Sequence, residues 1–134
     1  MKTFKFELDT PYRLFFSGMV QAITLTLLDG EITVYADHSF FTAPVQTGFI
    51  KIKDESGTWK KAFVSEGILE VKGHNSILMV NAAEWPEEID LERAEKALAA
   101  AEETIRLGNF KFETSTAETA AQRAKFRIKV KKSG

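Results

Sequence analysis

The sequence predicts a mainly β protein with an α-helical end: an N-terminal antiparallel β-sandwich or barrel over residues 1–84, then a C-terminal two-helix hairpin over residues 85–134. Two observations support this fold class. Residues 3–80 contain short runs of alternating apolar and polar residues, with turn-forming residues about every 8–12 positions. After Trp85-Pro86 the composition changes to alanine and glutamate, and apolar residues recur at helical spacing.

The strands are predicted from alternation and from the turns between the runs. In FKFEL, residues 4–8, apolar and charged residues alternate, and in ITLTLL, residues 23–28, the apolar residues share one face. Asp29-Gly30 then forms a strong two-residue hairpin signal. Further turn signals fall at Gly48, Asp54 to Gly57, Glu66-Gly67 and Gly73 to Asn75.

The first helix of the predicted hairpin has recognisable ends. Asp90 is placed as an N-cap, with acidic residues nearby that suit the positive end of the helix dipole. Gly108 is placed to end the helix. Between them a narrow seam for a second helix is formed by Leu91, Ala94, Leu98, Ala101 and Ile105. Because alanine buries little area, we expect this helix to be held weakly.

The second half of the tail fits two structures. A returning helix is indicated by the steps of three and four between Ala117, Ala121, Ala124 and Ile128. The stretch RAKFRIKVK, residues 123–131, also alternates basic and apolar residues, which is typical of a strand. The predicted hairpin takes the helical alternative, and the strand alternative stays open at this point.

Composition excludes several classes of protein. The 134 residues have a formal net charge of −1 and no cysteine. This excludes disulfides and thiol chemistry, and it argues against a protein-wide attraction to nucleic acid or anionic lipid. No apolar run approaches the ~20 residues that span a bilayer, and MKTFKFELDT lacks the apolar core of a signal peptide. We therefore expect a cytoplasmic protein that reaches a membrane only through a partner.

Residues for catalysis are sparse. The two histidines, His38 and His74, each lie in a turn-like context, whereas a metal site needs three or four converging ligands. No phosphate-binding loop, dinucleotide fingerprint or nucleophile elbow occurs. We expect no metal site, no required cofactor and no enzymatic activity.

The charges of the tail are divided between its halves. Residues 84–103 contain eight carboxylates and only Arg93 and Lys96 as basic residues. From Arg123 to Lys132 there are six basic residues and no carboxylate. The two arms of a hairpin would attract each other, or the basic arm could exchange this partner for an acidic surface elsewhere.

Four sequence blocks together resemble the ε subunit of F-type ATP synthases, and the resemblance covers nearly the whole chain. The blocks are SGMVQAITLTLLDGE, HSFFTAPVQTG, AFVSEGILEVKGHNSILMV and EEIDLERAEKALAAAEE, in the order and spacing of that family. The chain departs from the family at Glu66, where the family has glycine, and at residues 33–37, where TVYAD replaces Gly-Ile-Leu-Pro-Gly. These departures affect local turns rather than the fold.

The resemblance implies a non-catalytic rotor subunit of the central stalk. In that family the sandwich docks on the γ subunit and the c-ring, and the helical hairpin either folds back or extends into the α/β catalytic head and inhibits ATP hydrolysis. It implies a peripheral protein at the cytoplasmic face of a bacterial inner membrane. A weakly held hairpin suits such a bistable element.

Phe40 and Phe41 are the candidate docking residues of the sandwich. They follow His38 in a turn region where core packing does not require two adjacent aromatic side chains. Exposed apolar side chains often mark interfaces. The alternative is that one of the two belongs to the core and the other has no role.

The resemblance also implies a regulatory ATP site in the hairpin. Some bacterial members of the family bind ATP at an I-D-x-x-R-A motif, which is matched here by Ile89, Asp90, Arg93 and Ala94. Those members also use a glutamate five residues before the isoleucine and two arginines four apart in the second helix, matched here by Glu84, Arg123 and Arg127. The arginines would take the phosphates, and the two acidic residues would accept hydrogen bonds from adenine or ribose. Alternatively, Asp90 is only an N-cap and the arginines only pair with the acidic helix.

A different class of function is a small β-barrel that binds single-stranded nucleic acid. The residues that favour it are Lys51, Lys53, Lys60 and Lys61 with the aromatic residues Phe49 and Trp59. The simpler interpretation is a solvated sheet face. The near-neutral charge and the acidic first helix argue against nucleic acid as a partner.

Overall fold

The structure of the chain is a computed structural model that describes residues 2–27, 30–108 and 111–133. It divides into two compact units, Met1–Glu84 and Trp85–Gly134, which are described separately. The first unit is built from β1 (Phe4–Asp9), β2 (Leu14–Leu27), β3 (Gly30–Tyr35), β4 (Phe41–Val45), β5 (Gly48–Asp54), β6 (Trp59–Val64), β7 (Gly67–Lys72), β8 (Asn75–Val80) and β9 (Ala83–Glu84).

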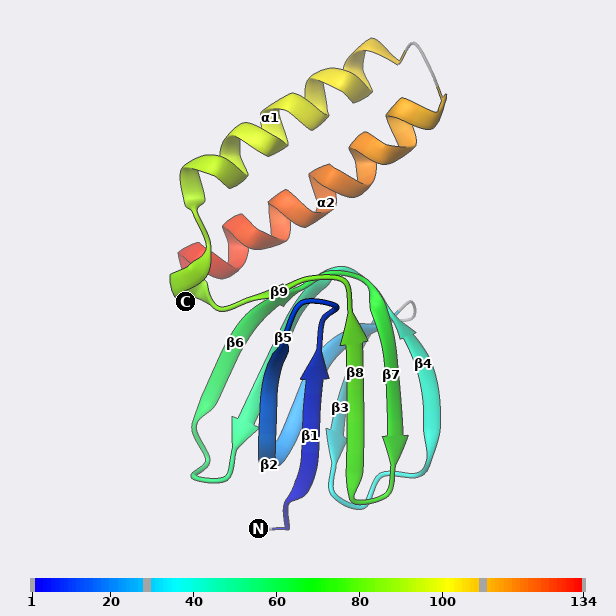
Figure 1. Cartoon of the computed structure of the whole chain (residues 1–134), viewed down its shortest axis with the longest axis vertical. Coiled ribbons are helices and arrows are strands. Elements are labelled where there is room, and N and C mark those ends of the chain that lie inside the picture. The colour runs from blue at the N-terminus through cyan, green and yellow to red at the C-terminus, as the bar shows by residue number, and fades with distance from the viewer. Residues whose placement is uncertain (1, 28–29, 109–110, 134) are drawn as a thin grey trace. The chain divides into compact units, whose positions relative to one another are not determined.

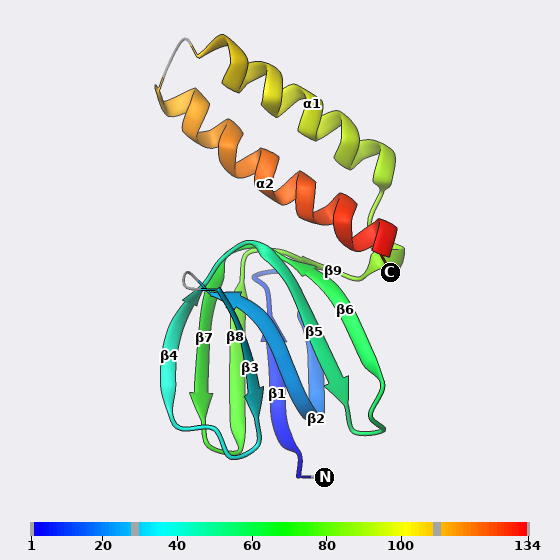
Figure 2. The same ribbon diagram turned by 180° about the vertical axis from the view of Figure 1, so that it is seen from behind.

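The strands of the first unit form two layers. Hydrogen bonding gives the order β1-β8-β7-β4-β2-β5-β6-β9, with β3 also paired to β2 and β1 also paired to β2. Figure 1 has β1, β8 and β7 nearest the viewer, and Figure 2 shows β2, β3 and β5 on the opposite side. The predicted N-terminal sandwich is therefore confirmed.

Strand β2 connects the two layers because it is long. Its first part pairs with β1, and its second part pairs with both β3 and β5. The register with β5 shifts between Val20 and Ala22, so a local irregularity lies where β2 changes neighbours. One long strand can thus contribute side chains to both sheets.

One pairing differs from the expected antiparallel pattern. Strand β1 is antiparallel to β2 on one edge and parallel to β8 on the other. Since β2 and β8 run in opposite directions, a strand that lies between them must be parallel to one of them. The remaining described pairings are antiparallel.

The core of the sandwich follows from the alternation along each strand. In β5, for example, Ile50 and Ile52 are fully buried, and Lys51 and Lys53 between and beyond them are half-buried on the outer face. The largest fully buried side chains are Phe4, Phe6, Phe63, Leu8, Ile23, Leu25, Ile50, Ile52, Leu69 and Leu78, with Val20 and Val34. The predicted β2–β3 hairpin is present, but Gly30 begins β3 opposite Leu27 rather than lying in the turn, and Asp29 lies outside the described residues.

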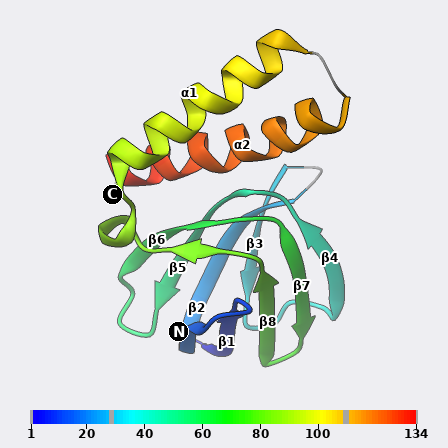
Figure 3. The same cartoon turned by 45° about the horizontal axis from the view of Figure 1, so that its top comes forward.

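The second unit is a helical hairpin. It consists of the short 3₁₀ helix η1 (Pro86–Glu88) and the helices α1 (Leu91–Leu107) and α2 (Lys111–Ser133). Figures 1 and 3 show α1 and α2 side by side and running in opposite directions. The C-terminal stretch is thus helical, and the strand alternative for residues 123–131 is wrong.

The contact between the two helices is made mainly by alanine. Ala101, Ala117 and Ala121 form its buried cluster, with Leu98 and Ile105 packed against it. The prediction differs from the structure near the end of α2. Ile128 is predicted in the seam but is only half-buried, whereas Val130 is buried. Alanine contacts allow the helices to approach closely, but they remove little apolar area from water.

Candidate functional site

The start of α1 is held by a side-chain cap. The backbone N–H of Arg93 donates to Asp90 Oδ1 at 3.1 Å, which confirms Asp90 as the N-cap. Ile89 and Ala94 are each only 4% exposed, so these two residues of the I-D-x-x-R-A motif have a packing role. Asp90 and Arg93 are exposed.

The predicted ATP-binding residues are divided between the two units. Glu84 belongs to the first unit, where it forms part of β9 opposite Phe63. The other six residues lie in the second unit: Arg93 and Ala94 in α1, Arg123 and Arg127 in α2, Asp90 at the N-cap of α1 and Ile89 just before it. An ATP site that includes all seven residues therefore remains a prediction.

A groove follows one flank of the hairpin. It has a volume of about 440 Å³ and is lined by Ala97, Ala100, Ala101, Thr104, Thr116, Ala117 and Ala120. Most of these residues immediately precede a seam residue in the sequence, so they lie about 100° around the helix from the seam. Because their side chains are small, the flank is hollow.

The three predicted arginines lie on the same flank. Arg93 and Arg123 precede the buried residues Ala94 and Ala124, and Arg127 lies one helical turn after Arg123. Arg123 also lines a further pocket of about 330 Å³, which shares Thr116 and Ala120 with the groove. Arg123 and Arg127 are half-buried and are one helical turn apart in α2. Helical geometry thus directs the three guanidinium groups to one side of the hairpin.

The end of α2 is hydrogen-bonded to the beginning of the second unit. Lys131 Nζ donates to the backbone carbonyl of Pro86 at 2.9 Å. This bond joins the basic end of the tail to η1 and thereby closes the hairpin at the end opposite its turn. A single hydrogen bond of this kind is easily exchanged for another acceptor.

Phe40 and Phe41 differ in their surroundings. Phe40 is 75% exposed, and a Cβ on Gly73 would approach its ring at 3.0 Å, so the ring lies beside the β7–β8 turn. Phe41 is half-buried, and its ring centroid lies 5.0 Å from that of His38. Phe40 therefore has the exposure expected of a docking residue, whereas Phe41 is partly used in local packing.

The sequence analysis missed a larger apolar surface on the sandwich. Pro44, Ile68 and Met79 are cross-strand neighbours on β4, β7 and β8, and Ile68 and Met79 are 47% and 43% exposed. They line a groove of about 730 Å³ that continues to Thr10 and Pro11. The available signal was an apolar residue at the outward position of three separate strands. Which strands are neighbours, however, is decided only by the fold.

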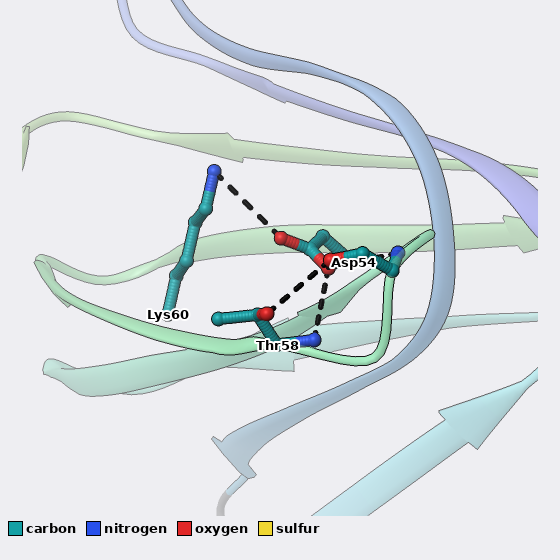
Figure 4. Close-up of polar contacts among 4 residues, drawn as sticks. Asp54, Thr58 and Lys60 are labelled. Atoms are coloured by element: carbon teal, nitrogen blue, oxygen red, sulfur yellow. Dashed lines mark hydrogen bonds and ion pairs between the residues drawn. The ribbon is translucent and has the colours of Figure 1, made fainter.

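The β5–β6 turn is organised by one carboxylate, shown in Figure 4. Asp54 Oδ1 accepts from the Ser56 hydroxyl at 2.6 Å and from the backbone N–H groups of Ser56 and Thr58 at 3.0 and 2.9 Å. Its other oxygen lies 4.0 Å from Lys60 Nζ. The Ser56 hydroxyl bond, followed by the backbone bonds, lowers the pKa of Asp54. The turn therefore presents β6 with Trp59 in a defined position.

All but Lys60 of the lysine and aromatic residues considered for nucleic-acid binding share one face, since Lys60 pairs with the buried Ile52 at the alternate position. Lys51 Nζ and Lys61 Nζ lie 5.5 and 4.3 Å from the Phe49 ring centroid, and Lys53 Nζ lies 5.9 Å from that of Trp59. Phe49 is half-buried, and Trp59 is 50% exposed. The Phe49 ring is thus engaged by the chain's own ammonium groups, which reduces its value for stacking a base.

The described ranges 2–27, 30–108 and 111–133 offer neither a metal-binding cluster nor a membrane-spanning helix. Within them no group of three or more His, Asp or Glu side chains is arranged to hold a metal ion. No helix in the same ranges combines the length and the apolar character needed to cross a membrane.

Comparison with known proteins agrees with the fold of both units. Residues 3–86 match the family model of the ATP synthase delta/epsilon chain β-sandwich domain, and residues 87–132 match that of its long α-helix domain. The ATP synthase epsilon chain of Caldanaerobacter subterraneus is 44% identical over 130 residues, which is 96% of this chain and 94% of the relative. That of Ruminiclostridium cellulolyticum is 35% identical over 128 residues, with 96% and 95% of the two chains covered.

Solved structures show the same fold at low sequence identity. A chain in the cryo-EM structure of the Euglena gracilis mitochondrial ATP synthase superposes with a TM-score of 0.82 at 22% identity, covering 92% of this chain and 78% of that one. A chain of the Tetrahymena thermophila enzyme, in a structure of its central stalk and c-ring, gives 0.67 at 16% identity, with 97% of both chains covered. On the strength of the two family models and the bacterial relatives, the chain belongs to the delta/epsilon family of ATP synthase subunits.

Proposed function

We propose that the chain is a central-stalk subunit that couples the γ subunit to the c-ring, and that its hairpin restrains ATP hydrolysis in response to ATP. Members of this family are non-catalytic subunits of ATP synthase. The proposal places the chain at the cytoplasmic face of a bacterial inner membrane, as a peripheral part of the complex. The observation that carries the regulatory part is the alanine contact between α1 and α2.

Docking on the rotor would use exposed apolar surface of the sandwich. Phe40 is the most exposed phenylalanine that the structure describes, and Ile68 and Met79 add an apolar surface across two adjacent strands. Apolar patches of this kind mark protein interfaces. We assign Phe40, with Phe41 beside it, to rotor contacts.

Assembly tests the docking assignment. Phe40→Ser and Phe41→Ser should each weaken co-purification of the chain with γ and the c-ring, and Phe40→Ser should do so without lowering the stability of the isolated chain. Tyr12→Ser is a matched control, because Tyr12 is 91% exposed at the β1–β2 turn and should tolerate the change. If both phenylalanine variants still assembled normally with γ and the c-ring, the assignment of Phe40 and Phe41 to rotor contacts would be wrong.

The hairpin has the properties of an element that can change state. Its helices meet through Ala101, Ala117 and Ala121, so separating them exposes little apolar area. The basic residues of α2 can exchange the acidic face of α1 for acidic surface on the catalytic head. A two-state element needs such a small energy difference between its states.

Deletion of the residues from Asp90 onward tests the inhibitory role. The truncated chain should still fold as a sandwich and still couple, whereas ATP hydrolysis by the assembled enzyme should rise relative to the full chain. Single Lys→Ala changes in α2 should have little effect, because exposed ion pairs contribute only ~0–1 kcal/mol each. A truncated chain that fails to fold would instead assign the tail a structural role.

ATP binding is proposed at the arginine-bearing flank of the hairpin, with Arg93, Arg123 and Arg127 on the phosphates and Asp90 and Glu84 on the nucleoside. At 100 times its dissociation constant, ATP should stabilise the binding-competent hairpin by about 2.7 kcal/mol. The thermal shift should be lost in Arg127→Ala and kept in Arg106→Ala, which removes an exposed arginine of α1 that pairs with Glu103. Absence of a shift for the unmodified chain at millimolar ATP would exclude this ligand.

A further inference from the structure

A groove on the outer face of the sandwich has a composition that rotor docking and the hairpin do not explain. Its volume is about 520 Å³, and side chains from β2, β3, β5 and β6 line it. Small-molecule sites in proteins have volumes of about 300–1,000 Å³. The groove is therefore large enough for a small ligand.

The groove arises from strand register. Thr33, Thr24, Lys51 and Lys61 are successive cross-strand partners from β3 to β6 and form one row on the outer face. The hydroxyl oxygens of Thr24 and Thr33 are 2.9 Å apart. The row therefore carries short hydroxyl side chains on β3 and β2 and long cationic side chains on β5 and β6.

An aromatic row lies next to it. Tyr35, Ala22, Lys53 and Trp59 are also successive partners across the same four strands. Ala22 and Lys53 lie between the two large rings in this row, and Tyr35 and Trp59 are 56% and 50% exposed. The exposed ring of Trp59 offers a face on which a planar group can stack.

The cations of this face repel one another. Lys51 and Lys61 are directly opposite each other, and like charges in that position are destabilising. Both ammonium groups lie close to the single ring of Phe49, at 5.5 and 4.3 Å from its centroid. Residues 51–61 carry four of the eight basic residues of residues 1–84. An anion bound between the two lysines would relieve this repulsion.

We propose that the groove binds a phosphate ester that carries a planar aromatic ring, which is the chemistry of a mononucleotide. The ring stacks on the exposed face of Trp59, and the phosphate lies over Lys51 and Lys61 with hydroxyl contacts from Thr24 and Thr33. Along β3 the groove extends from Tyr35 to Glu31, a distance of four residues or about 13 Å at ~3.3 Å per residue. That length suits one extended nucleotide rather than a nucleic-acid strand.

Glu31 provides an independent test of anion binding in the groove. It lines the β3 side of the groove, and its carboxylate opposes an anionic ligand. It lies one outward position along β3 from Thr33, beside the place assigned to the phosphate. Glu31→Gln should therefore tighten binding, an effect that a purely structural role for Glu31 would not produce.

Fluorescence of Trp59 tests the proposal in the full chain. Trp85→Phe leaves Trp59 as the single tryptophan, and Arg127→Ala in the same chain removes the ATP site proposed for the hairpin. The probes are AMP, adenosine, inorganic pyrophosphate and a thymidine oligonucleotide. AMP should quench Trp59 saturably, and adenosine and pyrophosphate should each bind at least tenfold more weakly than AMP.

Charge variants supply the decisive comparison. Lys51→Ala with Lys61→Ala should weaken AMP binding at least tenfold, whereas Lys72→Ala, which removes an exposed lysine paired with Glu70, should leave it unchanged. The proposal would be overturned if Lys72→Ala weakened AMP binding as much as the double lysine variant does. It would also be overturned if Glu31→Gln did not tighten AMP binding. Tighter binding of the oligonucleotide than of AMP would overturn it too, because the face would then be a nucleic-acid surface.

Discussion

Gly67 illustrates how a single position can be constrained by the backbone of a neighbouring strand. It begins β7, where Ile68 pairs with Met79 of β8. A Cβ built on Gly67 would lie 1.9 Å from the carbonyl oxygen of Met79 and 2.7 Å from a methyl group of Val80. The adjacent Glu66, which stands where the family has the first glycine of a Gly-Gly pair, makes side-chain hydrogen bonds with Thr47 and Asn81. Only the second glycine of the family motif is therefore required by packing in this chain.

We predict that Gly67→Ala destabilises the sandwich by at least about 1–3 kcal/mol, the usual cost of forcing atoms into a packed site. Gly18→Ala is the control, because the atom nearest to its added Cβ is a ring carbon of Phe16 at 3.6 Å. Urea unfolding followed by circular dichroism measures both variants. Equal midpoints for the two would mean that β8 moves aside at little cost.

Asp54 is the residue whose charge most clearly supports a turn. Its ionised carboxylate accepts three hydrogen bonds within the β5–β6 turn, and its pKa lies below the ordinary value of 3.8. A carboxyl group whose pKa is depressed in the folded state stabilises that state above its ordinary pKa. The stabilisation disappears as the pH falls through the lower folded-state value.

We expect Asp54→Ala to lower the urea midpoint at neutral pH, and we expect the difference from the unmodified chain to shrink below pH 3.8. Asp54→Asn should lose less at neutral pH, because an amide oxygen still accepts hydrogen bonds in the turn. A midpoint difference that does not vary between neutral and acidic pH would show that the charge of Asp54 is irrelevant to the turn.

At the scale of elements, the hairpin is defined by its ends more than by its core. Asp90 caps the start of α1, and Gly108 ends it in the left-handed region with φ of 60°. The contact between the helices contributes mainly alanine methyl groups. Capping energies of about 1 kcal/mol are therefore a large part of what stabilises α1.

Gly108→Ala should destabilise the hairpin by roughly 1–2 kcal/mol, because an alanine in the left-handed region brings its Cβ close to the following carbonyl. Gly108→Asn should cost less, since asparagine tolerates that conformation. Thermal unfolding followed at 222 nm distinguishes the two substitutions. Identical transitions for alanine and asparagine would show that the turn rearranges at this position.

At the scale of the whole molecule, the chain joins two units of different construction. The sandwich is held by bulky side chains from all of its long strands, whereas the hairpin is held by alanine contacts, caps and the bond from Lys131 to Pro86. Each unit has its own internal contacts. Two units with such different cores are expected to lose structure under different conditions.

We predict two separable unfolding transitions in urea. The signal at 222 nm should report the earlier loss of the helices, and near-ultraviolet aromatic signals should report the later loss of the sandwich. Gly108→Ala should shift only the first transition, and Gly67→Ala only the second. A single transition that both substitutions shift equally would contradict independent stability of the units.

Features that depend on neighbouring residues in the sequence could be predicted without the fold. Alternation placed the strands, Asp90 and Gly108 marked the ends of α1, and both ends are confirmed. Turn residues and helix caps act within a few residues, so their signals are local. For the same reason the resemblance to the family was detectable from short blocks of sequence.

Features that depend on residues far apart required the tertiary structure. Residues 123–131 carry both a helical and a strand pattern, and the structure shows them to be helical, within α2. The parallel pairing of β1 with β8 and the apolar neighbours Pro44, Ile68 and Met79 come from strand order. The row from Thr33 to Lys61 likewise exists only because four strands have a particular register. Sequence periodicity specifies which face of its own strand a side chain occupies, but its cross-strand neighbours are set by pairing between segments distant in the chain.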